Sequence, residues 1–261
     1  MDMVLSGVLS GALVSDKLSL FRATTDGAPP TFSFSPFFKR KRWRKEKYYK
    51  NEKSDLMNMK FTFTLTEIKE IGISAVVLSV AFAIAYSDGL FKIDLAHLPL
   101  LVLYAFVAVG IGFLAHELIG HKIVAQRLGM HAEFRMWRAG LVIALLSSLV
   151  GFVFAAPGAV YVSPKVDLWG RQSSVSNRRM GFVSLAGPLV NIGLAAVFIV
   201  LNTLHSMELF GLAIFVNIWL GIFNMLPIPP LDGSKVFSWD KRIWVVTFAA
   251  LIAMFVLVGM I

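Results

Sequence analysis

Cysteine is absent from this chain of 261 residues. Its absence excludes disulfides, thiolate nucleophiles, iron–sulfur clusters and zinc sites with cysteine ligands. A metal ion would therefore have to be bound by His, Asp or Glu side chains. Charged residues are also scarce, at 16% of the chain, whereas soluble domains have about 25%. Together with 57% hydrophobic residues and a mean hydropathy of +0.71, this scarcity indicates a membrane protein.

Positive charge is concentrated in one short block. Residues 39–53 contain nine Lys or Arg and two Glu, so they carry +7 of the net charge of +9 and leave +2 for the other 246 residues. Beside a series of membrane spans, such a block is typical of a cytoplasmic flank attracted to anionic lipid, and we do not expect it to bind nucleic acid. Residues 1–60 are predicted to be a disordered basic tail and residues 61–261 a membrane-embedded domain, whose chemistry the motifs below indicate. Met57 and Met59 leave open an alternative in which translation starts there and the tail is dispensable.

Six apolar stretches follow the tail, most of them near or above the ~20 residues that a membrane-crossing helix needs. They comprise residues 71–87, 98–126, 141–156, 180–204, 209–231 and 243–261. Because Lys and Arg are enriched on the cytoplasmic side of membranes, the basic tail predicts a cytoplasmic N-terminus in a multi-pass protein of the cell membrane.

The third stretch, residues 141–156, has cations on both flanks. Arg135 and Arg138 precede it and further Lys and Arg residues follow it, so both of its ends are predicted to be cytoplasmic. We therefore expect an all-α polytopic membrane protein with about five transmembrane helices and one re-entrant or membrane-embedded hairpin, or six helices if this stretch crosses. The alternation of polar and apolar residues over 133–137 predicts a short β element after the second span.

Two acidic residues lie deep in apolar stretches, Glu117 in the second and Asp232 at the end of the fifth. A charged group at membrane depth is costly, which favours a functional role. Glu117 lies in His116-Glu-Leu-Ile-Gly-His121, and two His with a Glu are typical of helical zinc sites in which the Glu is the general base. Three prolines interrupt the helix before Asp232, and such backbone is tolerated at membrane depth only where it lines protein or a wet cavity. If residues 180–204 make the one crossing between the two motifs, both lie near the cytoplasmic face.

The order of three motifs resembles that of the site-2 protease family of intramembrane zinc metalloproteases. The motifs are the His116-Glu117 helix, Gly187-Pro-Leu-Val-Asn191 in the middle crossing, and Asn224-x-x-Pro running to Leu231-Asp232-Gly233. The resemblance covers about residues 65–261. It implies one zinc ion per chain, with Glu117 as the catalytic base, and cleavage of a membrane-spanning protein substrate near the cytoplasmic face. The implied zinc ligands are His116, His121 and Asp232, and the implied supporting residues are Asn191 and Asn224.

The spacing of the two histidines departs from the family pattern, His-Glu-x-x-His, by one residue. On a regular helix, residues five apart point ~140° away from each other and residues four apart only ~40°, so His116 and His121 would face different sides. A π-bulge would absorb the extra residue, and Gly120 would ease the distortion. The spacing is similar to that of dipeptidyl peptidase III, a soluble zinc enzyme family, which implies that a metal can be bound this way.

The substrate is expected to be extended at the scissile bond, because a helix hides its carbonyl groups. It would then pair as a strand, with residues 133–137 or 159–162 as candidate edges. Two other functions stay open. One is a catalytically silent family member that binds membrane helices, for which the inserted residue is the main support. The other is an intramembrane metal or ion transporter, since buried His, Glu and Asp also mark ion paths.

Overall fold

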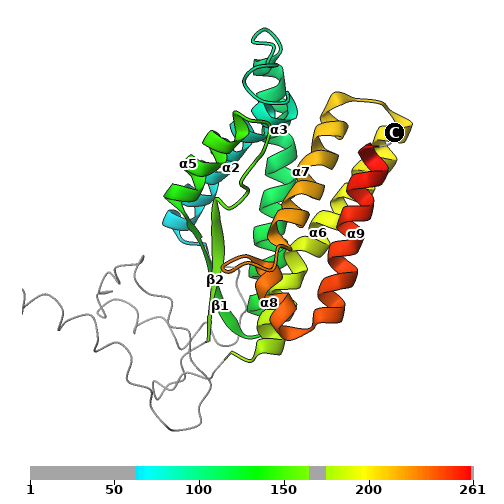
Figure 1. The fold of residues 1–261 in the computed structure, drawn as a ribbon. Helices are drawn as coiled ribbons and strands as arrows, with labels where there is room; N and C mark the ends of the chain where they lie inside the picture. Colours follow the sequence, from blue (N-terminus) through cyan, green and yellow to red (C-terminus); the bar gives the residue numbers. More distant parts are fainter. Residues whose placement is uncertain (1–62, 165–174, 260–261) are drawn as a thin grey trace, which may run out of the picture. The chain divides into compact units, whose positions relative to one another are not determined.

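The computed structural model of the chain describes residues 63–164 and 175–259. The predicted tail, residues 1–60, lies outside the described residues. The described elements, in chain order, are α2 (Leu65–Tyr86), α3 (Leu98–Leu114), the π-helix η2 (Ala115–Ile123), α4 (Val124–Arg127), β1 (Met130–Met136), α5 (Arg138–Ser148), β2 (Gly158–Pro164), α6 (Asn177–Leu204), α7 (Glu208–Asn224), α8 (Asp232–Trp239) and α9 (Lys241–Gly259). The fold is thus mostly helical with one small sheet (Figure 1).

Four helical segments in the described part of the chain are long and apolar enough to cross a membrane. They are Leu65–Tyr86, Leu98–Arg127, Asn177–Leu204 and Lys241–Gly259. Two further helices are apolar but shorter: α7 has 17 residues and α5 has 11. The chain is therefore a membrane protein with four candidate spans, and five crossings stay a prediction that depends on α7.

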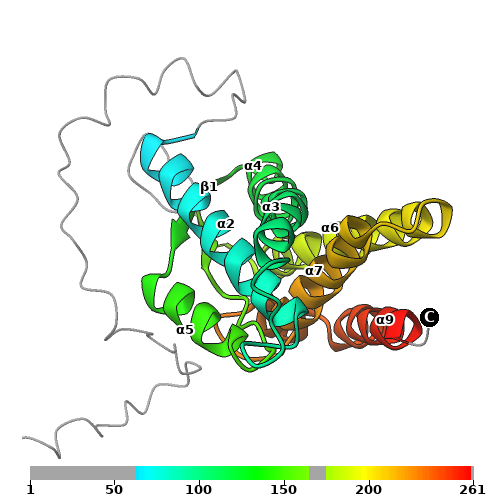
Figure 2. The ribbon, with the colours of Figure 1, turned by 90° about the horizontal axis from the view of Figure 1, so that it is seen from above.

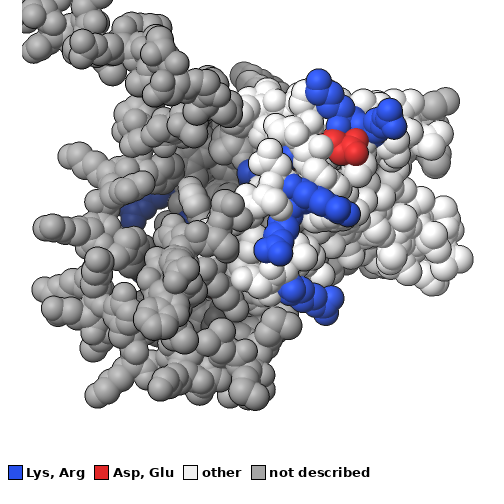
Figure 3. Space-filling view, turned by 90° about the horizontal axis from the view of Figure 1, so that it is seen from below, with Lys and Arg blue, Asp and Glu red and all other residues white. Residues whose placement is uncertain are grey.

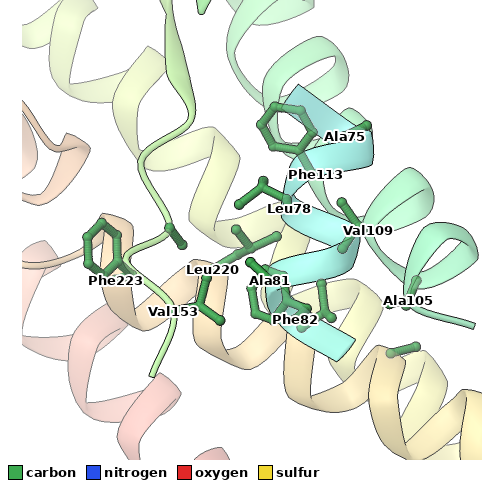
Figure 4. Close-up of a cluster of buried hydrophobic side chains, with 14 of the residues drawn as sticks. Ala75, Leu78, Ala81, Phe82, Ala105, Val109, Phe113, Val153, Leu220 and Phe223 are labelled. Carbon is green, nitrogen blue, oxygen red and sulfur yellow. The ribbon is translucent and has the colours of Figure 1, made fainter. Parts of the chain in front are cut away.

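The helices pack around a core formed mainly by α2, α3 and α7. Leu78 and Phe82 of α2, Val109 and Phe113 of α3, and Leu220 of α7 are all buried and face one another (Figure 4). Seen from above, α5 lies beside α2 at one side of the molecule, whereas α9 lies next to α7 at the other side (Figure 2). Helix α6 contacts α7, η2 and α8, so it joins the two halves of the candidate site described below.

The two strands form an antiparallel pair in which Met130 lies opposite Pro164 and Met136 opposite Gly158. The segment between the two strands, which includes α5, therefore begins and ends at the same edge of the sheet, where Met136 lies opposite Gly158. At its far end, the backbone N–H of Leu90, in the loop after α2, donates to the carbonyl of Leu149 at 2.9 Å. The re-entrant or membrane-embedded hairpin expected over residues 141–156 stays a prediction.

The predicted strand over residues 133–137 is displaced in the structure. Strand β1 begins three residues earlier, at Met130, and ends at Met136. Trp137 instead directly precedes α5, and its backbone N–H still donates to the carbonyl of Pro157 at 2.7 Å. The difference arises because the ends of β1 depend on which residues pair with β2. The alternation of polar and apolar residues within β1 does not indicate where this pairing begins and ends.

A buried ion pair ties α2 to the sheet and to η2. The Glu67 carboxylate lies 2.5 Å from the ammonium group of Lys122 and also accepts the backbone N–H of Phe134 at 2.9 Å. Glu70, one turn further along α2, accepts the N–H of Met136 at 3.1 Å. The outer edge of β1 is therefore already occupied by side chains of α2.

Candidate metal centre

A π-helical segment carries both histidines of the sequence motif. Segment η2 spans nine residues and continues directly from α3. Because a π-helix bonds residues five apart, His116 and His121 lie on the same side of it, with their Nε2 atoms 3.0 Å apart. The predicted π distortion is confirmed, and it extends beyond the single turn that the sequence required.

Asp232 completes the cluster from the other end of the chain. It is the first residue of α8, and its Oδ2 atom lies 3.0 Å from Nε2 of His121 and 3.6 Å from Nε2 of His116. All three side chains are buried, and their candidate ligand atoms lie within 4.8 Å of one another. Gly233 allows this approach, because a Cβ atom there would collide with the backbone carbonyl of Met225.

The other ring nitrogens of the two histidines are held by acceptors. Nδ1 of His121 donates to the backbone carbonyl of Val183 at 2.8 Å, and Nδ1 of His116 donates to Oδ1 of Asn191 at 2.5 Å. Each ring therefore presents an unprotonated Nε2 atom to the cluster. Two neutral imidazoles and one carboxylate form a donor set that suits zinc, with room for a further ligand at a catalytic site. Iron and cobalt also accept such ligands.

Glu117 lies beside the cluster and is buried. Its Oε2 atom has no hydrogen-bond partner among the residues that the structure describes. The backbone N–H of Val160, on β2, lies close to the same carboxylate. A buried carboxylate oxygen without a partner is costly to maintain, which favours a role in chemistry over a role in packing.

Close contact between η2 and α6 depends on two glycines. A Cβ atom at Gly120 would lie 2.5 Å from the Cα atom of Gly187. A Cβ atom at Gly187 would lie 2.5 Å from Nε2 of His121 and 2.7 Å from Nε2 of His116. Gly187 is also the first residue of the sequence motif in the middle crossing. In the structure this glycine leaves the space that the two imidazole rings occupy.

The asparagines differ in their relation to the cluster. Asn191 contacts His116 directly, as described above. Asn224 donates to the carbonyl of Leu220 in its own helix at 3.0 Å, and none of the described hydrogen bonds joins it to the candidate ligands. Asn217, which sequence reasoning missed, is buried and bonded to Asn191 at 2.9 Å. The available signal was a polar residue in an apolar helix, seven positions before Asn224 and thus on the same side of that helix.

Lys235 places a positive charge beside the cluster. Its Nζ atom lies 3.3 Å from Oδ1 of Asp232, the carboxylate oxygen that does not face the histidines. The positive charge of Lys235 favours the ionised form of the Asp232 carboxyl over the protonated form. Asp232 is therefore ionised, as a metal ligand must be.

Two curated relatives match the chain. A protein of Methanocaldococcus jannaschii named "Putative zinc metalloprotease MJ0611" is 38% identical over 200 residues, which cover 74% of this chain and 94% of that protein. This chain belongs to the same zinc metalloprotease family. A Bacillus subtilis relative, "Putative zinc metalloprotease YwhC", is 31% identical over 154 residues, which cover 51% of this chain and 67% of that protein. No protein-family model matches the chain, and no solved structure matches it significantly.

Membership of this family supports zinc as the metal and proteolysis as the chemistry. In the described part of the metalloprotease chain, His116, His121 and Asp232 form the one cluster of His, Asp or Glu side chains with a geometry suited to a metal ion. The sequence motifs and the geometry of the structure thus identify the same three candidate ligands.

Proposed function

We propose that this protein is an intramembrane zinc endopeptidase of the site-2 protease type, which hydrolyses peptide bonds of membrane-spanning substrates near the cytoplasmic face. The observation that carries the proposal is the location of the metal cluster. His116, Glu117 and His121 are buried within a segment, Leu98–Arg127, that is long and apolar enough to span a membrane. Ionisable groups in a membrane-spanning segment are costly, so their presence there favours chemistry within the membrane.

In this proposal His116, His121 and Asp232 hold zinc, with Asn191 and Asn224 as supporting residues. Bound zinc would lower the pKa of water and polarise the substrate carbonyl. Glu117 acts as the general base: its free Oε2 atom takes a proton from water and returns it to the leaving amine. The apolar residues around the cluster exclude bulk water, which strengthens each of these electrostatic interactions.

The substrate is proposed to pair with β2, at residues 159–162, rather than with residues 133–137. The outer edge of β1 is occupied, because Glu67 and Glu70 accept its N–H groups. Phe134 pairs with Val160 in the sheet, and the N–H of Phe134 points away from β2. By the alternation of an antiparallel pair, the N–H of Val160 points away from β1, towards Glu117. A strand added at this edge would lie beside the catalytic base.

Val162→Pro tests this edge. The N–H of Val162 points out of the sheet by the same alternation, so proline removes a donor to the substrate without breaking a bond to β1. We expect kcat/KM for a transmembrane substrate to fall about tenfold, as the loss of one hydrogen bond predicts, while zinc content stays at the wild-type level. Wild-type kcat/KM in this variant would show that the substrate binds elsewhere.

Charge at the ends of the helices supports a cytoplasmic orientation of the site. Arg178 and Arg179 lie in the first turn of α6, and Lys241 and Arg242 begin α9. Viewed from below, Lys and Arg side chains gather on this end of the molecule (Figure 3). Cations oppose the dipole at a helix N-terminus, so their role there is better explained by the cytoplasmic, anionic face of the cell membrane. Together with the basic tail, these residues are proposed to contact anionic lipid.

The experiment that tests the proposal is zinc analysis combined with cleavage of a model transmembrane substrate by the purified full-length chain. We expect one zinc ion per chain, cleavage at a bond near the cytoplasmic boundary, and loss of both zinc and cleavage in His121→Ala. His205→Ala is a matched control, because His205 follows the end of α6 in an exposed position outside the cluster.

Two results would contradict the proposal. Wild-type protein that binds zinc without cleaving any transmembrane substrate would instead identify a silent relative that holds membrane helices. Zinc flux into vesicles that depends on Glu117, without proteolysis, would identify a transporter.

A further inference from the structure

A chain of buried amide groups connects α7 to the metal cluster. The Nδ2 atom of Asn191 donates to Oδ1 of Asn217 at 2.9 Å and to the backbone carbonyl of Gly112 at 3.3 Å. The Nδ2 atom of Asn217 donates to the carbonyl of Ala213 at 2.8 Å. Asn191, Asn217 and His116 are all buried. The chain thus runs from α7 through α6 to the histidine ring.

The direction of every hydrogen bond in this chain is determined by backbone carbonyls. The carbonyls of Ala213 and Gly112 can only accept, so the amide nitrogens of Asn217 and Asn191 must face them. Oδ1 of Asn217 then faces Asn191, and Oδ1 of Asn191 faces His116. Nδ1 of His116 must therefore carry the proton, which leaves Nε2 free for the metal.

The contribution of Asn217 is to oppose rotation of the Asn191 amide. If that amide turned over, its oxygen would face Oδ1 of Asn217, and two acceptors would meet in a fully buried site. The carbonyl of Gly112 alone is a weaker restraint, because it is 3.3 Å away. Helix α3 also closes the space around Asn217, since a Cβ atom at Gly112 would lie 2.9 Å from its Oδ1 atom.

We propose that Asn217 is a positioning residue for the zinc site, which fixes the Asn191 amide so that His116 presents its Nε2 atom to the metal. The inference rests on the proposed zinc chemistry and deepens it. An ordinary interhelical hydrogen bond would join α7 to α6 without affecting metal binding. A positioning role requires that loss of Asn217 weaken metal binding through Asn191 alone.

The test is a double-mutant cycle on zinc affinity, measured in the purified full chain by competition with a chelator. Asn217→Leu and Asn217→Ala both remove the oxygen that accepts from Asn191. Leucine keeps a side chain of similar volume, whereas alanine leaves a small cavity, so at least one of the two variants is expected to fold. We expect each to lower zinc affinity about 10–100-fold, as loss of an outer partner of a metal ligand does. In an Asn191→Leu background, the same changes at Asn217 should lower the affinity no further.

Ser79→Ala is the matched control. The Ser79 hydroxyl is buried and donates to Ala75 in its own helix, as Asn217 does to Ala213, but it lies on α2 outside the chain of amides. Zinc affinity should be unchanged in this variant. Unchanged affinity in both Asn217 variants, or losses that add fully to that of Asn191→Leu, would overturn the proposal.

A second measurement does not depend on variants. In zinc-free wild-type protein labelled with ¹⁵N-histidine, the His116 ring should carry a proton on Nδ1, and an unprotonated Nδ1 atom would overturn the proposal. Neither measurement requires proteolysis. Failure of the protease proposal, seen as zinc binding without cleavage, is thus distinguishable from failure of this one.

Discussion

Glu117→Gln is expected to leave one zinc ion per chain in place and to lower the rate of cleavage about 10²–10⁴-fold, the range that a general base contributes. Glutamine has nearly the same shape as glutamate but cannot take a proton from water. The three candidate ligands keep their partners, because none of their described hydrogen bonds involves Glu117. Zinc content and the cleavage rate of a transmembrane substrate should be measured on the same preparation.

The control for this variant is Glu208→Gln. Glu208 lies in the first turn of α7 and contacts His97, at the opposite end of that helix from Asn224. Removal of its charge should leave both zinc and cleavage unchanged. A Glu117→Gln enzyme that cleaves at the wild-type rate would mean that another group takes the proton, and the assignment of the base would be wrong.

Gly187→Ala is expected to lower zinc affinity by at least the roughly 10–100-fold that perturbation of a metal ligand's surroundings costs, and to abolish cleavage with it. The added methyl group would lie 2.5 Å from Nε2 of His121 and 2.7 Å from Nε2 of His116, so the rings must move or α6 must withdraw. Movement of the rings separates them from Asp232, and withdrawal of α6 removes the acceptors of their Nδ1 atoms, Asn191 and Val183. Equilibrium zinc binding measures the effect directly.

The same helix offers a matched control. Gly193 lies six residues further along α6, and a Cβ atom there would have no neighbour within 4 Å. Gly193→Ala should retain zinc and be slightly more stable, because alanine favours a helix over glycine by about 1 kcal/mol. If Gly187→Ala also retained zinc with wild-type affinity, the ligands would be more tolerant of displacement than their packing indicates.

The apolar stretches and the motifs were visible in the sequence because both are local patterns. Long apolar runs predict helices of membrane length, and the described helices α2, α6 and α9 follow them closely. The helix that begins at Leu98 continues to Arg127, one residue beyond the predicted stretch 98–126, with the π segment where the extra residue required it. Boundaries were less predictable: the stretch 141–156 forms helix only in its first part, as α5 ends at Ser148.

The relation of Asn217 and Gly187 to the site was beyond sequence reasoning. Asn217 is separated from its partner Asn191 by 26 positions, and nothing in the pattern of α7 indicates which buried amide meets which. Gly187 was part of a recognised motif, but the reason for a glycine there is a contact with two rings on another helix. Such facts depend on distances between elements.

The sequence by itself determined the membrane character, the absence of cysteine ligands, and the identity of His116, Glu117, His121 and Asp232 as candidate zinc-site residues, because composition, hydropathy and short motifs are properties of neighbouring residues. Only the tertiary structure decided that Asp232, 111 positions after His121, lies 3.0 Å from it. It also decided which ring nitrogens face the cluster and that side chains of α2 occupy the outer edge of β1. Packing of α6 against η2 and α8 fixes these relations, and packing is a property of surfaces that meet only after the chain has folded.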